Sequence, residues 1–178
     1  MTIVEFIAAE IRRLHAMLDA ATAGLTPEQW HTVPGGAGSK ANHLAFEMWH
    51  YIRTEDNIVR FILQNRRPTV WMEGGWAERL GLPPVAQGTG MSVEDAHALR
   101  IRDLDAFRQY VREVYASTDE WLANPDQATF AAPVLVKPLG EMPAIRALGQ
   151  VVMTHGFTHL GEIELMRTLM GLKPAIGV

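Results

Sequence analysis

The chain has 178 residues, of which 48% are hydrophobic and 20% are charged, and its formal net charge is −4. This length can bury a sizeable core, so we expect residues 1–178 to form a single domain, and the slight acidity without a basic stripe argues against a nucleic-acid partner. No apolar run is long enough to span a bilayer, and the first residues lack the basic-then-apolar order of a signal peptide. Cysteine is absent, so the chain has no disulfides and no thiolate metal ligands. Together these features favour a cytoplasmic protein.

The first expected element is a long helix over residues 2–20. Its apolar residues recur at steps of three and four, the spacing of one helical face: Ile3, Ile7, Ile11, Leu14 and Leu18. A Thr-Pro-Glu sequence at residues 26–28 then predicts a short helical turn, which ends in the glycine-rich residues 33–39.

A second long helix is expected from Ser39, a residue able to cap it, to about Gln64. The connection that follows, residues 66–91, is unusually long for a compact helical bundle. It carries Trp71 and Trp76 around a pair of glycines. Two interpretations are open: the tryptophans plug the end of the core, or the segment forms a lid or wall over a pocket.

The third helix is predicted to open at Ser92, where the sequence resembles a capping box. Its apolar stripe consists of Ile101, Leu104, Phe107, Val111 and Val114. The fourth helix is expected to begin after Pro143 and to end near Gly171. Residues 133–138 are bounded by prolines and are too short to anchor a sheet. The sequence therefore predicts an all-α fold, a four-helix bundle with a long connection between helices two and three.

Two histidines, His155 and His159, lie one turn apart on the apolar stripe of the fourth helix. At about 100° per residue they share that stripe with Val152 and Ile163. An unpaired polar group in an apolar interior costs about 1–3 kcal/mol, and two stacked imidazoles are harder to satisfy with backbone carbonyls than one. A shared metal ion satisfies both rings. The pair alone is a weak signal, so a metal site needs a third ligand.

The second helix offers that ligand. One of its faces, about 100° from the main apolar face, carries His43, Glu47, His50, Thr54 and Asn57. This face could be solvated surface or the lining of a cavity, and the neighbouring Ile58 and Phe61 favour a cavity. His50 is the better candidate ligand because it lies mid-helix, where it can meet the helix-four pair. Three imidazoles with a coordination position left free are typical of a catalytic rather than a structural metal site.

Other residues are candidates for the pocket or for orienting a ligand. Glu162 lies close to the His159 side of helix four and could hold that ring. Glu47 and His43 are candidate general bases, His43 is also a candidate fourth ligand or substrate contact, and Thr54 and Trp76 are candidate pocket residues. Glu47 and His50 also spell the Glu-x-x-His of di-iron bundles. Such a site needs a second copy and two further glutamates, and helix four supplies His-x-x-x-His instead.

Several segments, taken together, resemble a known family. LTPEQWHTVP at 25–34, WHYIRTED at 49–56 and HGFTHLGEIELMRTLMG at 155–171 are similar to successive landmarks of the DinB-like, or YfiT-like, superfamily. GGWAERLGLP at 74–83 resembles a segment of one branch. The resemblance implies a four-helix bundle, often dimeric, with a divalent metal held by three histidines, which here are His50, His155 and His159. Members include thiol-dependent S-transferases and isomerases and hydrolases, and many have no assigned reaction.

These observations lead to two functional hypotheses. The first is a metal-dependent enzyme in which zinc, nickel or iron activates either water for hydrolysis or a low-molecular-weight thiol cosubstrate for S-transfer to a small molecule. A thiol must come with a substrate because the chain has no cysteine. The second is a non-catalytic helical module that binds an apolar ligand or partner, with a structural metal or none. The far side of helix four carries Met153, Phe157 and Leu160, which predicts a homodimer contact or a neighbouring helix.

Overall fold

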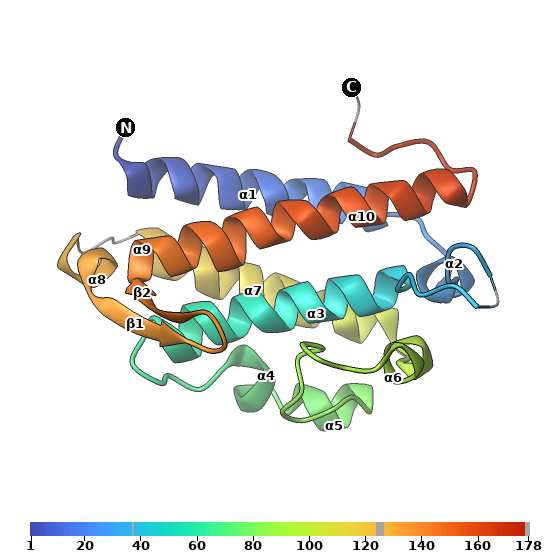
Figure 1. The fold of residues 1–178 in the computed structure, drawn as a ribbon, viewed down its shortest axis with the longest axis horizontal. Coiled ribbons are helices and arrows are strands. Elements are labelled where there is room, and N and C mark those ends of the chain that lie inside the picture. Colours follow the sequence, from blue (N-terminus) through green and yellow to red (C-terminus); the bar gives the residue numbers. More distant parts are fainter. Residues whose placement is uncertain (37, 124–126, 177–178) are drawn as a thin grey trace.

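The structure is a computed structural model that describes residues 1–36, 38–123 and 127–176. Within these ranges four long helical segments lie side by side (Figure 1). They are α1 (Ile3–Thr22), α3 (Leu44–Asp56) with its continuation η1 (Asn57–Ile62), α7 (Leu104–Ala123), and the continuous segment formed by α9 (Ala144–Ala147), η2 (Leu148–Thr154) and α10 (His155–Leu169). Helix α10 packs against α1 and α3, and α7 packs against the same two helices. The prediction of an all-α fold is confirmed.

Shorter elements connect these segments. Helix α2 (Pro27–His31) follows α1, and α4 (Val70–Glu73), α5 (Trp76–Leu80) and α6 (Val93–Ala98) lie between η1 and α7. Helix α8 (Gln127–Ala131) precedes a two-stranded antiparallel sheet of β1 (Pro133–Val136) and β2 (Gly140–Pro143). None of the helices in the described ranges combines the length and hydropathy needed to span a membrane.

The local starts of the helices follow from capping. The Thr2 hydroxyl accepts a hydrogen bond from the Glu5 amide, and the Glu5 carboxylate accepts one from the Thr2 amide, which forms a capping box at α1. Helix α3 begins at Leu44 rather than near Ser39, because the side chain of His43 acts as its N-cap and accepts from the Phe46 amide at 3.1 Å. An imidazole cap is not among the usual N-cap residues, so the sequence pattern pointed to serine instead.

The third predicted helix is divided in two. Residues 99–103 separate α6 from α7, and within this break the Ile101 amide donates to His31 Nε2 at 3.0 Å. Asp103 then caps α7 by accepting from the Ala106 amide at 2.9 Å. The hydrogen bond to His31 of α2 therefore interrupts the helix within a segment that has no helix-breaking residue.

The prediction that residues 133–138 form no useful strand was wrong. Strand β1 pairs with β2 from Pro133 opposite Pro143 to Val136 opposite Gly140. Val136 and Met142 are buried beneath the sheet, with 4% and 6% of their surface exposed. This small sheet is held by packing on the helices, a stabilisation that the short sequence pattern does not reveal.

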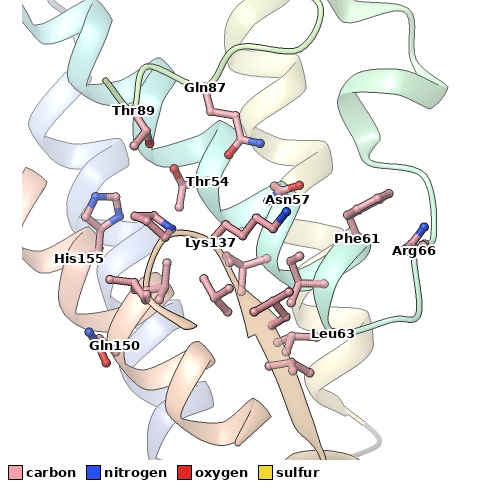
Figure 2. Close-up of a pocket in the computed structure, with 18 of the residues that line it drawn as sticks. Thr54, Asn57, Phe61, Leu63, Arg66, Gln87, Thr89, Lys137, Gln150 and His155 are labelled. Atoms are coloured by element: carbon pink, nitrogen blue, oxygen red, sulfur yellow. The ribbon is translucent and has the colours of Figure 1, made fainter. Parts of the chain in front are cut away.

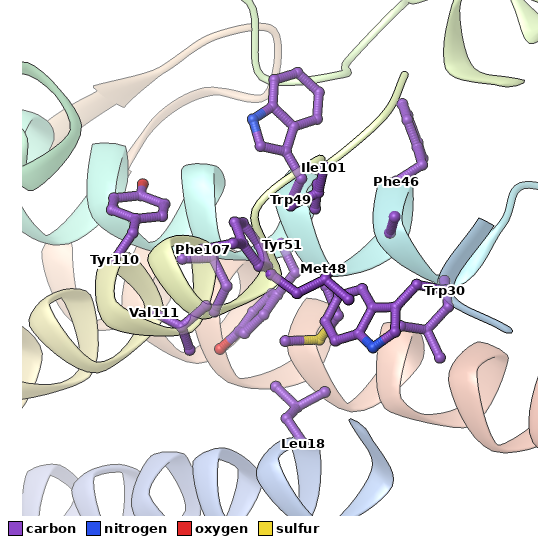
Figure 3. Packing of buried hydrophobic residues seen from close by; sticks show 14 of the residues in the cluster. Leu18, Trp30, Phe46, Met48, Trp49, Tyr51, Ile101, Phe107, Tyr110 and Val111 are labelled. Atoms are coloured by element: carbon purple, nitrogen blue, oxygen red, sulfur yellow. The ribbon is translucent and has the colours of Figure 1, made fainter. Parts of the chain in front are cut away.

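The long connection contributes to the core. The indoles of Trp71 and Trp76 are 1% and 0% exposed and pack on Tyr110 of α7, with ring centroids 5.0 and 5.7 Å away. Asp56 at the end of α3 accepts hydrogen bonds from the Val70 and Trp71 amides at 2.8 and 2.9 Å. Figure 3 shows the same cluster extending through the aromatic residues of α3 and α7. The two tryptophans therefore plug the core.

A buried polar network lies between α1, α3 and α7. The Glu55 carboxylate, fully buried, accepts from the hydroxyls of Tyr51 at 2.7 Å and Thr118 at 2.6 Å. It also pairs with His15 Nε2 at 3.0 Å, and the His15 ring stacks on Tyr115. These partners explain how a glutamate can interrupt the apolar face of α3, because both oxygens of the carboxylate are hydrogen bonded.

Candidate metal centre

Three imidazole rings from two helices converge at one point. His50 lies on α3, and His155 and His159 lie in the first turns of α10. The ring centroids of His50 are 5.2 Å from His155 and 5.1 Å from His159, and those of the helix-α10 pair are 4.3 Å apart. One nitrogen of each ring lies within 4.8 Å of the other two, close enough for all three to ligate one metal ion. The structure thus brings together the three predicted ligands.

Gly156 allows this convergence. A Cβ atom at this position would lie 2.3 Å from Leu14 Cδ2 and 2.6 Å from Tyr51 Cε2, far inside van der Waals contact. Helix α10 can therefore approach α1 and α3 closely only because residue 156 has no side chain. The close approach brings the rings on either side of Gly156 within reach of His50.

Two carboxylates hold the ring of His159. Its Nδ1 lies 2.6 Å from Glu47 Oε2 and 2.8 Å from Glu162 Oε2. This nitrogen donates to the carboxylates, so Nε2 faces the other rings and lies 2.8 Å from His155 Nε2. A carboxylate behind a ligating imidazole fixes the ring and raises its basicity as a ligand. Glu47 and Glu162 therefore occupy the orienting position that was predicted for Glu162.

A backbone carbonyl holds the ring of His50. Its Nδ1 is hydrogen bonded to the carbonyl oxygen of Gln87, in the long connection between η1 and α7. Because Nδ1 is used in this way, Nε2 is the nitrogen left to face the cluster. The connection can approach the His50 ring this closely because residue 88 is a glycine with a φ of +96°. A Cβ atom there would lie 2.9 Å from His50 Nδ1.

Replacing Gly88 by alanine is therefore expected to weaken metal binding. The left-handed backbone conformation disfavours alanine and its Cβ would displace the His50 ring, so we expect a loss of about 10- to 100-fold in metal affinity, the usual effect of losing an orienting partner. The measurement is competition with a chromophoric zinc chelator. The matched control is Gly90→Ala, because Gly90 also has a positive φ but its Cβ would meet nothing within 4 Å. Equal affinities of the two variants would contradict this role of Gly88.

The pKa values of the rings differ sharply. Burial, together with the neighbouring His159 and His50, lowers the pKa of His155 to about 4. Burial also lowers the pKa of His50. Burial acts in the same direction on His159, but the hydrogen bonds to Glu162 and Glu47 outweigh it and raise its pKa to about 9. Two rings are therefore neutral at neutral pH, and His159 carries a proton when no cation is present.

The donor set fits a divalent transition metal. Three imidazoles suit zinc, nickel and iron, and the outer nitrogens of His50 and His159 are already held by hydrogen bonds. His155 Nδ1 is buried without a hydrogen bond of good geometry, although the Val151 carbonyl one turn earlier lies close enough to raise the pKa of the ring. Protonated His159 can donate from Nε2 to His155 Nε2 at 2.8 Å, and a cation could take the place of that proton between the two rings.

A cavity of about 1060 Å³ adjoins two of the three rings. His50 and His155 line it, together with residues of η1, η2, the β1–β2 sheet and the loop at Gln87 and Thr89 (Figure 2). Both η1 and η2 are π-helical, and they contact each other beside the cavity. π-Helical turns are rare and occur frequently at functional sites. The cavity is therefore the space in which a small molecule can reach the candidate metal centre.

The other predicted pocket residues fall in different places. Thr54 lines the cavity. His43 does not: its Nδ1 caps α3 and its Nε2 lies 3.5 Å from Arg100 Nη1, and burial, with His31 and Arg100 nearby, lowers its pKa to about 4. Trp76 does not line the cavity either, because its buried indole donates to Glu113 at 3.2 Å beneath the Arg79 guanidinium. Glu47 lies behind His159, where it acts on the ring rather than in the cavity.

Sequence reasoning missed the backbone of Gln87 and Gly88. A backbone carbonyl that accepts a hydrogen bond from His50 has no side-chain signal in the sequence, and the only hint was that the connection is longer than a compact bundle requires. Asn65 and Arg66, with left-handed φ values of 51° and 64°, were also missed. Their conformation follows from the π-helical end of η1, where the Arg66 amide donates to the Phe61 carbonyl at 2.8 Å.

The fold and this site define a class: an all-α protein whose two adjacent helices carry a three-histidine group able to hold a metal ion. The family model of the DinB superfamily matches residues 10–163, and the chain belongs to that superfamily.

One solved structure is similar over almost its whole length. It is described as the crystal structure of the conserved protein of locus from Enterococcus faecalis, and the match has a TM-score of 0.80 at 17% identity and covers 96% of this chain and 99% of that one. At this identity the likeness concerns the fold alone. No curated protein matches the sequence.

Proposed function

We propose that this protein binds one divalent transition metal through Nε2 of His50, His155 and His159 and is a metal-dependent enzyme acting on a small molecule. The observation that carries the proposal is the convergence of three rings, two of them with their outer nitrogens held, at the wall of a large cavity. When bound, such an ion supplies Lewis acidity, which lowers the pKa of a water molecule or a thiol.

The chain's own residues supply orientation and a partly apolar wall. Gln87 fixes His50, and Glu47 and Glu162 fix His159. Ile58, Phe61 and neighbouring aliphatic residues exclude water from one side of the cavity, while Thr54 and Asn57 offer neutral hydrogen-bonding groups. Among the described residues that line the cavity there is no aspartate or glutamate. No carboxylate of the described cavity lining can therefore serve as the general base of the proposed reaction.

Two reaction types suit this site, hydrolysis and thiol S-transfer. The chain contains no cysteine, so in S-transfer the thiol is a low-molecular-weight cosubstrate. Small-molecule sites usually measure about 300–1,000 Å³. The volume of about 1060 Å³ is at the upper end of this range and has room for one small molecule or for a thiol beside a second one, so it is compatible with both reaction types.

The proposal includes zinc, nickel or iron as the ion, a homodimer and a cytoplasmic location. On α10 and the end of η2, Phe157 and Met153 are half-buried and remain available for a second copy. Leu160, which was predicted to share that face, is only 2% exposed and belongs to the core of its own chain. The dimer contact would therefore rest on fewer apolar residues than the sequence indicated.

The competing hypothesis is a non-catalytic module with a structural metal or none. Cobalt substitution separates the two, because an ion with a free coordination position changes its visible spectrum when a further ligand binds. We expect the absorption of the cobalt-loaded protein to shift when azide or a small thiol is added. His155→Ala, treated in the same way, is the control. A cobalt spectrum that neither addition changes would favour the structural module.

A further inference from the structure

The charged side chains of the cavity wall are all cationic. Arg66, which follows η1, and Lys137, in the turn between β1 and β2, are the charged residues among the described ones that line it. With no aspartate or glutamate in the lining, these two give it a formal charge of +2, whereas the whole chain has a net charge of −4. The charge of the cavity lining is therefore opposite in sign to the net charge of the protein, which favours the entry of anions.

Neither cation has a partner among the described residues. In the part of the chain that the structure describes, the Lys137 ammonium and the Arg66 guanidinium make no ion pair and no side-chain hydrogen bond. By contrast Arg60, two residues before the end of η1, is paired with Glu73 at 2.6 Å, and Arg67 donates to Gln64 at 3.0 Å. Two free cations at one cavity leave their hydrogen-bonding capacity to a ligand.

The two cations come from different walls of the cavity, and the end of η1 fixes the backbone of Arg66. Asn65 and Arg66 are consecutive non-glycine residues with positive φ. The Arg66 amide donates to the Phe61 carbonyl at 2.8 Å, and this bond at the π-helical end of η1 accounts for the conformation of both residues. Lys137 comes from the opposite wall, and Figure 2 shows its side chain running from the turn into the cavity, toward Asn57 in that view.

The remaining lining is largely apolar between the cations and the imidazoles. Ile58, Phe61, Val134 and Val151 line the cavity together with His50 and His155. A ligand that fills this space meets cations, an aliphatic and aromatic surface, and the candidate metal centre.

We infer that the substrate of this site is an anion, a carboxylate or phosphate ester with an apolar body, which the positive charges of Lys137 and Arg66 attract into the cavity. This inference rests on the proposed function, since it assigns a substrate class to the cavity beside the metal centre. The two cations favour the charged end of such a molecule, and η1 and β1 supply apolar surface for the rest of it beside the candidate metal centre.

The test compares octanoate with octanamide, which share size and apolar body but differ in charge. Calorimetric titrations use the full chain both free of metal and loaded with zinc. We expect octanoate to bind the metal-free protein at least tenfold more tightly than octanamide. Lys137→Gln and Arg66→Gln are each expected to weaken octanoate about five- to tenfold and to leave octanamide unchanged. Both replaced residues are exposed, so the variants retain the fold.

Arg67→Gln is the matched control, because it removes an exposed guanidinium one residue away that does not line the cavity. Equal binding of acid and amide, unchanged octanoate affinity in both cavity variants, or no saturable octanoate binding up to about 10 mM would each overturn the inference. A preference for the acid that exists only with zinc would overturn it too, because the carboxylate would then be held by the metal. The metal-free titration tests the anion site, whereas the metal content tests the proposed function. The inference and the proposed function can therefore fail independently of each other.

Discussion

Replacing His155 by alanine is expected to abolish metal uptake while the helical fold is retained. The ring supplies one of only three imidazole donors, and losing a ligand costs more than the roughly 10- to 100-fold that losing an orienting partner costs. Alanine is the best helix former, and His155 is only half-buried, so the helix itself should not suffer. The measurement is metal content per chain after equilibration with zinc, alongside circular dichroism and thermal unfolding.

His50→Ala and His159→Ala should give the same loss. His159→Ala also removes the partner of Glu47 and Glu162, so its thermal stability must be compared separately. His97→Ala is the control, since its ring lies away from the site and bonds the Ala41 carbonyl at 2.8 Å. Unchanged metal stoichiometry in His155→Ala would remove the basis of the proposed metal centre.

Replacing Glu55 by glutamine is expected to give the largest loss of stability that any single charge removal produces in this fold. The carboxylate accepts from Tyr51, Thr118 and His15, and a glutamine amide cannot accept all three. Breaking a buried charged network of this kind costs about 3–5 kcal/mol. For a chain of this size that corresponds to a fall of roughly 10 °C in Tm, measured by scanning calorimetry.

The stability loss should depend on pH. Burial raises the pKa of Glu55, but His15 and the hydrogen bonds from His15, Thr118 and Tyr51 outweigh it, so the pKa lies below its ordinary value of 4.5. A depressed carboxyl pKa contributes stability above the unfolded value, and that contribution is lost as the pH falls through the folded one. The difference between the wild type and Glu55→Gln is thus expected to be full at pH 7 and to shrink below about pH 4.5.

Glu10→Gln is the control for this experiment. Its carboxylate contacts only Arg13, at 2.9 Å on the solvent side of α1, and such changes usually stay within about 0.5 kcal/mol. Similar Tm values for the two variants, or a difference that grows as the pH falls, would show that the Glu55 carboxylate is not held by the network described.

The helices and the three imidazoles could be predicted because their signals are local. The step of three and four residues predicts the buried stripe of α1 from Ile7 to Leu18, whereas Ile3, which was predicted to share it, is 66% exposed. The four-residue spacing of His155 and His159 places both rings on one side of a helix. His50 was favoured by its mid-helix position and by the family resemblance. Whether these rings bind metal stays a prediction.

Other features could not be predicted because they depend on distant contacts. The break before α7 depends on His31, which is seventy residues away, and the position of His50 depends on a carbonyl with no sequence signature. The two π-helical segments also alter the helical wheel: hydrogen bonds of the i→i+5 type shift the faces on either side of η2, so a constant 100° step does not describe the whole segment.

The β1–β2 sheet that forms one wall of the cavity has consequences for how a molecule enters. A two-stranded ribbon is at best marginally stable by itself in water, and here two buried side chains, Val136 and Met142, anchor it to the helices. Such a unit detaches at a lower free energy than the helices need to separate. Ligands can therefore exchange when the ribbon detaches locally, while α3 and α10 keep the three imidazoles in position. The ribbon therefore controls entry to the cavity, whereas the helices α3 and α10 fix the positions of the three imidazoles.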